Sequence, residues 1–370
     1  MDQDTLRRLL PWGLTALGVL VLICLWSFVS TGVAVLYMGV WVAIGVVVFA
    51  GWRRLLMIGL VLLLVTFFTG ALIRFLPGDP TYDILPSSTP EERADLREEL
   101  GLDEPIFAQY GNFIQDFVTG DTRYYQGGVE GSDVRSEKVW DRLGDRLPRS
   151  LQLMLYAQLL ALIVALPLGI LAAYRAGTRT DKFLNLSAFA LLSLPNFVLA
   201  YILIYYLAVK NDFFPTSGYV SFSEDPSEHF KSMFLPTVSL AVAQIAVYMR
   251  LLRSDMIQTL QEDFITMARA KGLTTRRILL RHALRPSSFS LLTVAAINLG
   301  ALIGGAVIIE VIFQLGGVGT LLLRSILARQ YEALQTFVGV IAIAYVLVNV
   351  IVDVLYSILD PRIRHARATA

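Results

Sequence analysis

Residues 151–174 read LQLMLYAQLLALIVALPLGILAAY and contain no charged side chain. A helix that crosses the hydrocarbon core of a bilayer needs about 20 predominantly apolar residues, so this stretch is long enough to span a membrane. Its leucines, alanines and isoleucines are also residues that an α-helix accommodates well. The stretch therefore predicts a transmembrane helix.

Seven further stretches of similar length also lack charged residues, and they cover residues 12–29, 32–50, 55–73, 183–209, 232–249, 286–309 and 333–352. The composition agrees with them: 55% of the residues are hydrophobic and 16% are charged, against about 25% charged residues in a soluble domain. The mean hydropathy is +0.61. We expect an all-α integral membrane protein with eight spans.

The first stretch admits a second interpretation, because Arg7 and Arg8 precede it as they would precede a secretory signal peptide. Its length and the span that follows at once favour a transmembrane helix over a cleaved signal. Cys24 lies within it and is the single cysteine of the chain, which excludes an intrachain disulfide. We interpret it as an apolar packing or lipid-facing residue.

The basic residues predict the orientation, because cytoplasmic loops of membrane proteins are enriched in Lys and Arg. Residues 77–149 carry 16 acidic and 8 basic side chains, whereas residues 250–285 carry 3 acidic and 8 basic ones. Placing 77–149 outside and 250–285 inside also puts the arginines of the other short basic loops in the cytoplasm. We expect both termini to be cytoplasmic.

The outer segment, residues 77–149, contains a clear helix start. In Thr89-Pro90-Glu91-Glu92 the threonine suits the N-cap, proline the first turn, and the two acids the positive end of the helix. We expect this helix to run to about Leu100 and to be closed by Gly101. The segment is either an ordered cap over the outer mouth or a docking surface for an extracytoplasmic partner.

The inner segment, residues 250–285, mixes basic and apolar residues. Residues 264–271 suit a short helix that Gly272 would stop, and Thr274 or Thr275 could cap a second helix that ends before Pro286. Two short helices would then meet at a glycine elbow. A basic amphipathic stretch of this kind lies on anionic lipid or presents itself to a partner protein.

The run Ala268-Arg269-Ala270-Lys271-Gly272-Leu273, followed by His282, resembles the cytoplasmic loop of dipeptide and oligopeptide ABC importer permeases. That loop belongs to the "EAA" class, which docks into a groove of the ATPase subunit. Thr266 stands where the general pattern has a glutamate, a departure that the peptide branch often shows. The resemblance implies that these seven residues couple the chain to an ATPase through residues 263–285.

Further motifs in the family's order support the resemblance from about residue 55 to 363; they include Pro77-Gly78-Asp79-Pro80, Ser193-Leu194-Pro195-Asn196-Phe197, Gly304-Gly305-Ala306-Val307 and Asp360-Pro361-Arg362. Gly316 departs from the proline that the family usually shows before glycine. The resemblance implies a type I ABC importer transmembrane domain over residues 53–370 with six core spans. Residues 1–52 fall outside it and look like an accessory hairpin.

The resemblance also implies partners: two ATPase subunits, a second permease subunit that is usually a different chain, an extracytoplasmic binding protein and the lipid bilayer. The sequence contains no G-x-x-x-x-G-K-[ST] run, so we expect no ATP binding, no cofactor and no enzymatic activity in this chain, with ATP and Mg held by the partners. Its three histidines lack ligand spacing, so we expect no metal site. The net charge of +1 gives no sign of a nucleic-acid partner.

Five polar or charged residues stand within or at the ends of predicted spans, namely Gln244, Asn298, Glu310, Asn349 and Asp353. Side chains of this kind at membrane depth face a bundle interior or a water-filled pathway. We favour helix packing for the three amides. For the two acids we favour a structural role over substrate contact.

The function that the resemblance implies is import of di- and oligopeptides across the cytoplasmic (inner) membrane of a prokaryote. The permease would work by alternating access, driven by ATP hydrolysis in its partners. The same scaffold also serves importers of nickel, glutathione or oligosaccharides. A channel or membrane receptor that needs no ATPase is the alternative from another class.

Overall fold

The computed structural model describes residues 52–74, 79–84, 89–126 and 135–359. Cys24, the first two predicted spans and the accessory hairpin lie outside these residues. The described chain forms two compact units. The first unit comprises the described residues up to Pro148 together with Leu321–Val350, and the second contains Arg149–Thr320.

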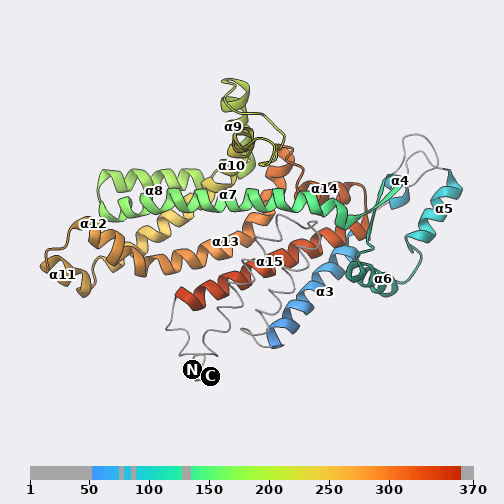
Figure 1. Ribbon diagram of the computed structural model, residues 1–370, viewed down its shortest axis with the longest axis horizontal. Coiled ribbons are helices and arrows are strands. Elements are labelled where there is room, and N and C mark those ends of the chain that lie inside the picture. The colour runs from blue at the N-terminus through green and yellow to red at the C-terminus, as the bar shows by residue number, and fades with distance from the viewer. Residues whose placement is uncertain (1–51, 75–78, 85–88, 127–134, 360–370) are drawn as a thin grey trace. The chain divides into compact units, whose positions relative to one another are not determined.

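The outer segment and two long helices make up the first unit (Figure 1). Its elements are α3 (Trp52–Arg74), α4 (Pro80–Ile84), α5 (Pro90–Glu99), α6 (Ile106–Thr119), β1 (Arg123–Gln126), β2 (Arg135–Lys138), the start of α7 and most of α15 (Tyr331–Leu359). The strands pair antiparallel with Tyr124 opposite Glu137. This hairpin departs from the all-helical expectation, and its Tyr124-Tyr125 pair suits a strand because aromatic residues favour that conformation.

The two long helices of the first unit are tied to each other and to the outer segment. Gln335 of α15 donates a hydrogen bond from Nε2 to the carbonyl oxygen of Thr66 in α3 (3.1 Å). The Tyr110 hydroxyl of α6 donates to the carbonyl oxygen of Leu63 (2.7 Å) and lies 2.9 Å from the hydroxyl of Thr66. The ring of Tyr110 also meets that of Phe67 edge to face. These contacts anchor α6 on α3.

The helix predicted from Thr89 onward is confirmed. Thr89 is the N-cap of α5, where its side-chain oxygen accepts a hydrogen bond from the Glu92 N–H (3.3 Å) and the Glu92 carboxylate accepts one from the Thr89 N–H (2.8 Å). This reciprocal pair is a capping box. The helix ends at Glu99, and Gly101 follows with a φ of 58°.

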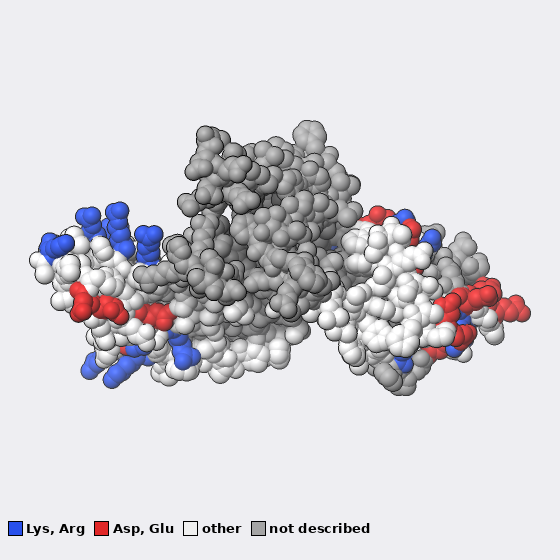
Figure 2. Space-filling view, turned by 90° about the horizontal axis from the view of Figure 1, so that it is seen from below, with Lys and Arg blue, Asp and Glu red and all other residues white. Residues whose placement is uncertain are grey.

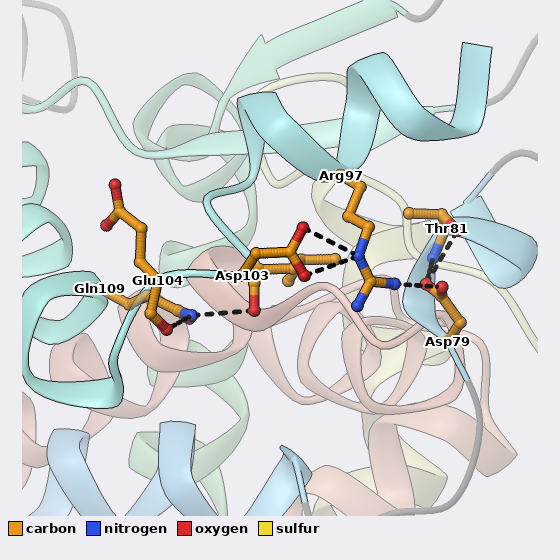
Figure 3. Close-up of polar contacts among 7 residues, drawn as sticks. Asp79, Thr81, Arg97, Asp103, Glu104 and Gln109 are labelled. Carbon is orange, nitrogen blue, oxygen red and sulfur yellow. Dashed lines mark hydrogen bonds and ion pairs between the residues drawn. The ribbon is translucent and has the colours of Figure 1, made fainter. Parts of the chain in front are cut away.

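A three-residue ionic clamp holds the outer segment together (Figure 3). Arg97 of α5 donates from Nη1 to Asp79 (2.7 Å) and from Nε to Asp103 (2.9 Å). Asp79 also accepts hydrogen bonds from the N–H and the hydroxyl of Thr81. Partial burial raises the pKa of Asp79, but the bonds from Thr81 and the charge of Arg97 outweigh burial, so this pKa lies below its usual value.

Helices alone form the described part of the second unit. They are most of α7 (Val139–Tyr174), α8 (Arg179–Leu192), α9 (Asn196–Leu203), the π-helix η1 (Ile204–Val209), α10 (Pro226–Thr259), α11 (Asp263–Ala270), α12 (Thr275–Arg277), the π-helix η2 (Ile278–Ala283), α13 (Leu284–Ile312) and the start of α14 (Val318–Leu327). Figure 1 shows α7, α8, α10 and α13 running alongside one another, with α11 and α12 at one end.

Three of the predicted spans appear as long apolar helices, namely α7, α10 and Tyr331–Val350 of α15. The span predicted at 183–209 is a helix pair bent by 98° at Pro195, and the one at 286–309 lies in a pair bent by 52°. The described residues thus hold three spans, or five if each bent pair is one span, with a shorter apolar helix at Ile58–Arg74. The multi-pass helical class is confirmed, and the number of spans stays a prediction.

Small residues on α7 let the helices of the second unit approach closely. Ala157, Ala161 and Ala165 recur every four residues and are fully buried. One turn further, a Cβ placed on Gly169 would lie 3.1 Å from the carbonyl oxygen of Met249 in α10. Close packing of this kind stabilises helix pairs in membranes, where apolar surface by itself gives no driving force for association.

Candidate functional site

The inner segment forms the elbow that the sequence predicted. Helix α11 ends at Ala270, Lys271 caps it, and Gly272 adopts a φ of 76°. An L-residue with a side chain adopts this left-handed conformation only at a cost, which explains the glycine. Thr274 then precedes α12 as its N-cap.

The predicted end of the second helix before Pro286 is wrong. α12 continues without a break through η2 into α13, which begins at Leu284. Pro286 is the third residue of α13 and lies in its first turn. The proline is accommodated where η2 passes into α13, because the π-helix shifts the backbone hydrogen-bond register just before it. The second arm of the elbow is thus the beginning of a long helix.

Helix α11 buries one face and exposes the other. Ile265 and Ala268 are buried, whereas Phe264 and Met267 are 44% and 58% exposed. The opposite arm exposes Leu280 in the same way. Apolar side chains on a water-facing loop are costly unless something covers them, so this surface is suited to contact with a partner or with lipid.

The seven residues predicted to contact an ATPase divide by exposure. Arg269, Ala270, Lys271 and Gly272 are exposed, Leu273 and His282 are half-buried, and Ala268 is buried beneath the elbow. The second arm adds the exposed Arg276, Arg277 and Arg281. Figure 2 shows Lys and Arg side chains standing out at the end that α11 and α12 occupy in Figure 1. The elbow therefore presents a basic surface with apolar side chains set into it.

A buried ion pair joins α8 to α10 a short way before the elbow. Both oxygens of the Asp181 carboxylate accept hydrogen bonds from Arg253, at 2.5 and 2.7 Å. The Asp181 side chain is only 4% exposed, and it also accepts from the N–H of Gly177 and from Asn185. The carboxylate is therefore fully bonded. No local sequence pattern points to this pair, because its members lie 72 residues apart.

Two hydroxyl contacts join α10 to α13 at the same end. Thr259 and Ser287 share a hydrogen bond of 2.9 Å, and Ser290 donates to the carboxylate of Asp255. Together with the Asp181–Arg253 pair, they fix the final turns of α10 against both neighbouring helices. The two arms of the elbow therefore start from a rigid base.

The structure brings two of the predicted intramembrane polar residues together. Asn298 of α13 donates a hydrogen bond to Gln244 of α10 at 2.9 Å and also bonds to the hydroxyl of Tyr248. That hydroxyl donates to the buried Gln158 of α7 at 3.1 Å. The four side chains form one network across three helices, which supports the packing role expected for Gln244 and Asn298.

Glu310 lies in a separate cluster at the end of α13, and it is 1% exposed. Its carboxylate accepts hydrogen bonds from the N–H groups of Gly319 (2.8 Å) and Thr320 (3.4 Å) at the start of α14, and it also bonds to the hydroxyl of Ser150. Ser150 in turn accepts from the N–H of Val318 (2.9 Å). The first N–H groups of a helix have no partner within the helix, and an anion there interacts favourably with the helix dipole.

The other two intramembrane residues lie on α15. Asn349 is half-buried, and Asp353 follows one turn later on the same helix. The side chain of Asp353 lies outside the described part of the structure. The five predicted residues therefore do not form one cluster, and their assignment to a pathway or to packing stays a prediction.

These features define a multi-pass helical membrane protein. It has apolar helices joined by polar networks, and it carries an exposed basic elbow about Gly272. A family model described as "binding-protein-dependent transport system inner membrane component" matches residues 165–365, and the model of the N-terminal part of such components matches residues 49–154. The chain belongs to this family, and it is a multi-pass protein of the inner membrane. The resemblance found in the sequence is thereby confirmed.

Relatives match the chain over most of its length. A probable peptide ABC transporter permease of Sinorhizobium fredii is 35% identical over 314 residues, which cover 85% of this chain and 98% of the relative. An oligopeptide transport system permease of Bacillus subtilis is 33% identical, with 85% and 98% covered. A dipeptide transport system permease of Escherichia coli is also 33% identical, with 82% and 95% covered.

Proposed function

We propose that this chain is the membrane-spanning permease subunit of an ATP-driven importer of di- and oligopeptides. ATPase subunits would couple to it through residues 263–285. The observation that carries the proposal is the elbow at Gly272, a rigidly based pair of helical arms with an exposed basic and apolar surface. The names of the relatives, which specify peptides, dipeptides and oligopeptides, support the substrate class.

The partners follow from the family and the chemistry of the chain. A binding-protein-dependent permease receives its substrate from an extracytoplasmic binding protein and its energy from ATPase subunits, here taken to be two. A second permease subunit would complete the pathway. ATP hydrolysis would displace the elbow, and α10 and α13 would carry that displacement into the membrane, because both helices run from the elbow into the bundle.

The conformation of Gly272 gives a direct test of coupling. A Cβ at this position would meet nothing within 4 Å, so a substitution there acts only through the backbone. Gly272→Val puts a β-branched residue into the left-handed region at a cost of about 1–2 kcal/mol. Gly272→Asn is the matched control, because asparagine tolerates that region and removes the same glycine. We expect the valine variant to lose substrate-stimulated ATP hydrolysis and transport together, and the asparagine variant to retain both.

The readouts are the ATPase rate and peptide uptake in proteoliposomes that hold the complete complex. Equal abundance of both variants in the membrane establishes that insertion is unaffected. If Gly272→Val transported at the wild-type rate with its ATPases bound, the elbow would not be the coupling element. Equal loss in the valine and asparagine variants would assign the effect to the added side chain and not to backbone conformation.

The charge of the elbow gives a second test of the same surface. Arg269→Glu reverses an exposed charge beside the glycine, and we expect it to weaken ATPase association more at low salt than at high salt, because salt screens exposed charges. Purification without any ATPase would favour the channel or receptor alternative. Uptake of nickel, glutathione or an oligosaccharide in place of peptides would keep the importer and change its substrate.

A further inference from the structure

The first unit holds a cavity of about 290 Å³ that is open to solvent and that the proposed transport mechanism does not use. Its walls come from the end of α3, the turn between α5 and α6, one face of α6, and the turn that leads into α15. The buried side chains of Ile84, Phe113 and Tyr125 form part of its lining. A volume at the lower end of the range for ligand pockets suits a molecule smaller than a typical drug.

The wall of this cavity carries charges of both signs. Six ionisable side chains line it: Arg74, Glu98, Glu104, Asp116, Arg329 and Glu332. The carboxylates and the guanidinium groups among them offer partners for an ammonium group and for a carboxylate. The excess of acidic groups disfavours a purely anionic ligand.

Specific hydrogen bonds hold the wall in shape. Gln109 of α6 donates from Nε2 to the carbonyl oxygens of Leu102 and Glu104, which fixes the turn before α6 (Figure 3). Asn112, one turn along α6, donates to the Glu104 carboxylate at 3.0 Å. On the opposite side, the amide of Gln330 pairs with the backbone N–H and carbonyl of Tyr125. The cavity is therefore a built feature of the unit.

One wall residue is held in a costly conformation. Arg329 follows α14 with a φ of 48°, in the left-handed region that glycine or asparagine usually occupies after a helix. An arginine there costs on the order of 1 kcal/mol in backbone strain, and strained residues of this kind cluster at binding sites. The same conformation closes α14, because the Gln330 N–H donates to the carbonyl oxygen of Ser325 (2.9 Å), and it places Arg329 in the wall.

Two wall side chains have hydrogen-bonding capacity to spare. Arg74 Nε and Gln109 Oε1 are buried, and neither has a hydrogen-bond partner among the described residues. Arg74 Nε is a donor and Gln109 Oε1 is an acceptor. A ligand that carries only acceptors or only donors would therefore leave one of these two atoms without a hydrogen-bond partner. A ligand with both an acceptor and a donor could satisfy both after modest side-chain rotations.

We propose that this cavity binds a small zwitterion, the size of an amino acid or dipeptide, with its carboxylate at Arg74 and Arg329 and its ammonium group at Asp116 and Glu104. A metal ion is a poor candidate, since no group of three or more acidic, His or Cys side chains in the described ranges could hold one. The proposal concerns binding at the outer segment and goes beyond transport through the spans.

Binding of radiolabelled alanylalanine tests the proposal. The full-length chain, copurified with its accompanying subunits and placed in nanodiscs without a binding protein, should bind one molecule per chain saturably. The N-acetyl and carboxamide derivatives each lack one charge and should bind at least about tenfold more weakly, which corresponds to one charge-assisted contact. Asp116→Asn and Arg74→Gln should weaken alanylalanine to a similar extent. Asp95→Asn, an exposed change on α5 outside the cavity, should leave the affinity unchanged.

Absence of saturable binding would overturn the proposal and leave the cavity filled with water only. Equal affinity for the blocked derivatives would also overturn it, as would wild-type binding by both Asp116→Asn and Arg74→Gln. Thermal unfolding of each variant separates lost binding from lost folding, and Asp116→Asn changes no side-chain volume. Because the readout is binding, a negative result leaves the proposed transport function standing. Conversely, a failed Gly272→Val test leaves the cavity proposal intact.

Discussion

Removing the Glu310 carboxylate should destabilise the second unit measurably. In Glu310→Ala the N–H groups of Gly319 and Thr320 and the hydroxyl of Ser150 lose their common partner in a buried site. A hydrogen bond to a charged group contributes about 1.5–3 kcal/mol, and a carboxylate at a helix N-terminus adds about 0.3–1 kcal/mol. Desolvation of the carboxylate offsets part of this gain. We therefore expect a loss of about 3 kcal/mol, whereas Glu310→Gln, which keeps one acceptor oxygen, should lose about half as much.

Thermal unfolding of the purified chain in detergent measures this loss. A change of 1 kcal/mol shifts the midpoint by about 2–4 °C for domains of 150–250 residues, so Glu310→Ala should melt roughly 6–12 °C lower. Glu224→Ala, which removes an exposed carboxylate, is the matched control and should melt like the wild type. Normal melting of Glu310→Ala combined with lost transport would refute the structural role and indicate contact with the substrate.

The glycines around Glu310 extend this test into a double-mutant cycle. A Cβ on Gly317 would lie 2.5 Å from the Glu310 carboxylate and from the Ser150 hydroxyl, so Gly317→Ala should cost about 1–3 kcal/mol by overpacking. Combined with Glu310→Ala it should cost less, because the carboxylate is gone and only the Ser150 hydroxyl, the end of a short rotatable side chain, remains in the way. A Cβ on Gly319 would instead lie 2.6 Å from the backbone Cα of Val307, so Gly319→Ala should not be rescued in this way. Absence of any rescue of Gly317→Ala by Glu310→Ala would show that the clash is not with Glu310.

Three further predictions concern other parts of the chain. Arg253→Leu leaves the buried Asp181 unpaired and should lower stability by about 3–5 kcal/mol, with unfolding measured as above; a loss under 1 kcal/mol would contradict the buried pair. Because the pKa of Asp79 is lowered, the outer clamp contributes its full stability above the ordinary Asp pKa of about 3.9 and loses it as the pH falls through the lowered value. Amide exchange in α5 should therefore speed up at low pH, and Asp79→Asn should abolish this pH dependence. In a cysteine-free background on intact cells, an impermeant thiol reagent should label a cysteine at Asp95 and miss one at Thr275; the reverse would overturn the orientation.

Local signals in the sequence predicted the elements that local physics determines. The uncharged run at 151–174 predicted α7 because an apolar stretch of this length is rarely anything other than a membrane-spanning helix. Thr89, Pro90 and the two acids after them predicted the start of α5, and the capping box found there satisfies N–H groups within four residues. Gly272 predicted the elbow because the turn depends on the backbone angle φ of this one residue, which glycine can adopt at a positive value. The alanines of α7 at four-residue spacing are also a pattern that predicts close helix packing, and the sequence prediction did not include it.

Predictions failed where the outcome depended on neighbouring segments. Pro286 suggested a helix end, yet its place in the first turn of α13 depends on the π-helix η2 before it, for which the sequence offers no clear signal. The short hairpin of β1 and β2 needs a partner strand, and four residues of either strand carry little periodicity. A structural role was predicted for Glu310 without its contact to helix α14, because the hydrogen bonds between them form only in the folded chain.

Helix α10 shows why the polar contacts of the second unit lie beyond sequence reasoning. Its ties to α7, α8 and α13 join residues 90, 72, 54 and 28 positions apart, at Tyr248, Arg253, Gln244 and Thr259. Each tie satisfies a polar group that would otherwise be costly within an apolar bundle, and each fixes the rotation of α10 against a different neighbour. A helix of 34 residues, about 51 Å long at 1.5 Å per residue, is held in this way both within the bundle and beside the elbow. A force at the elbow would therefore act on α10 as a whole, so a substitution that frees one tie should weaken coupling even where it leaves Gly272 and its surface unchanged.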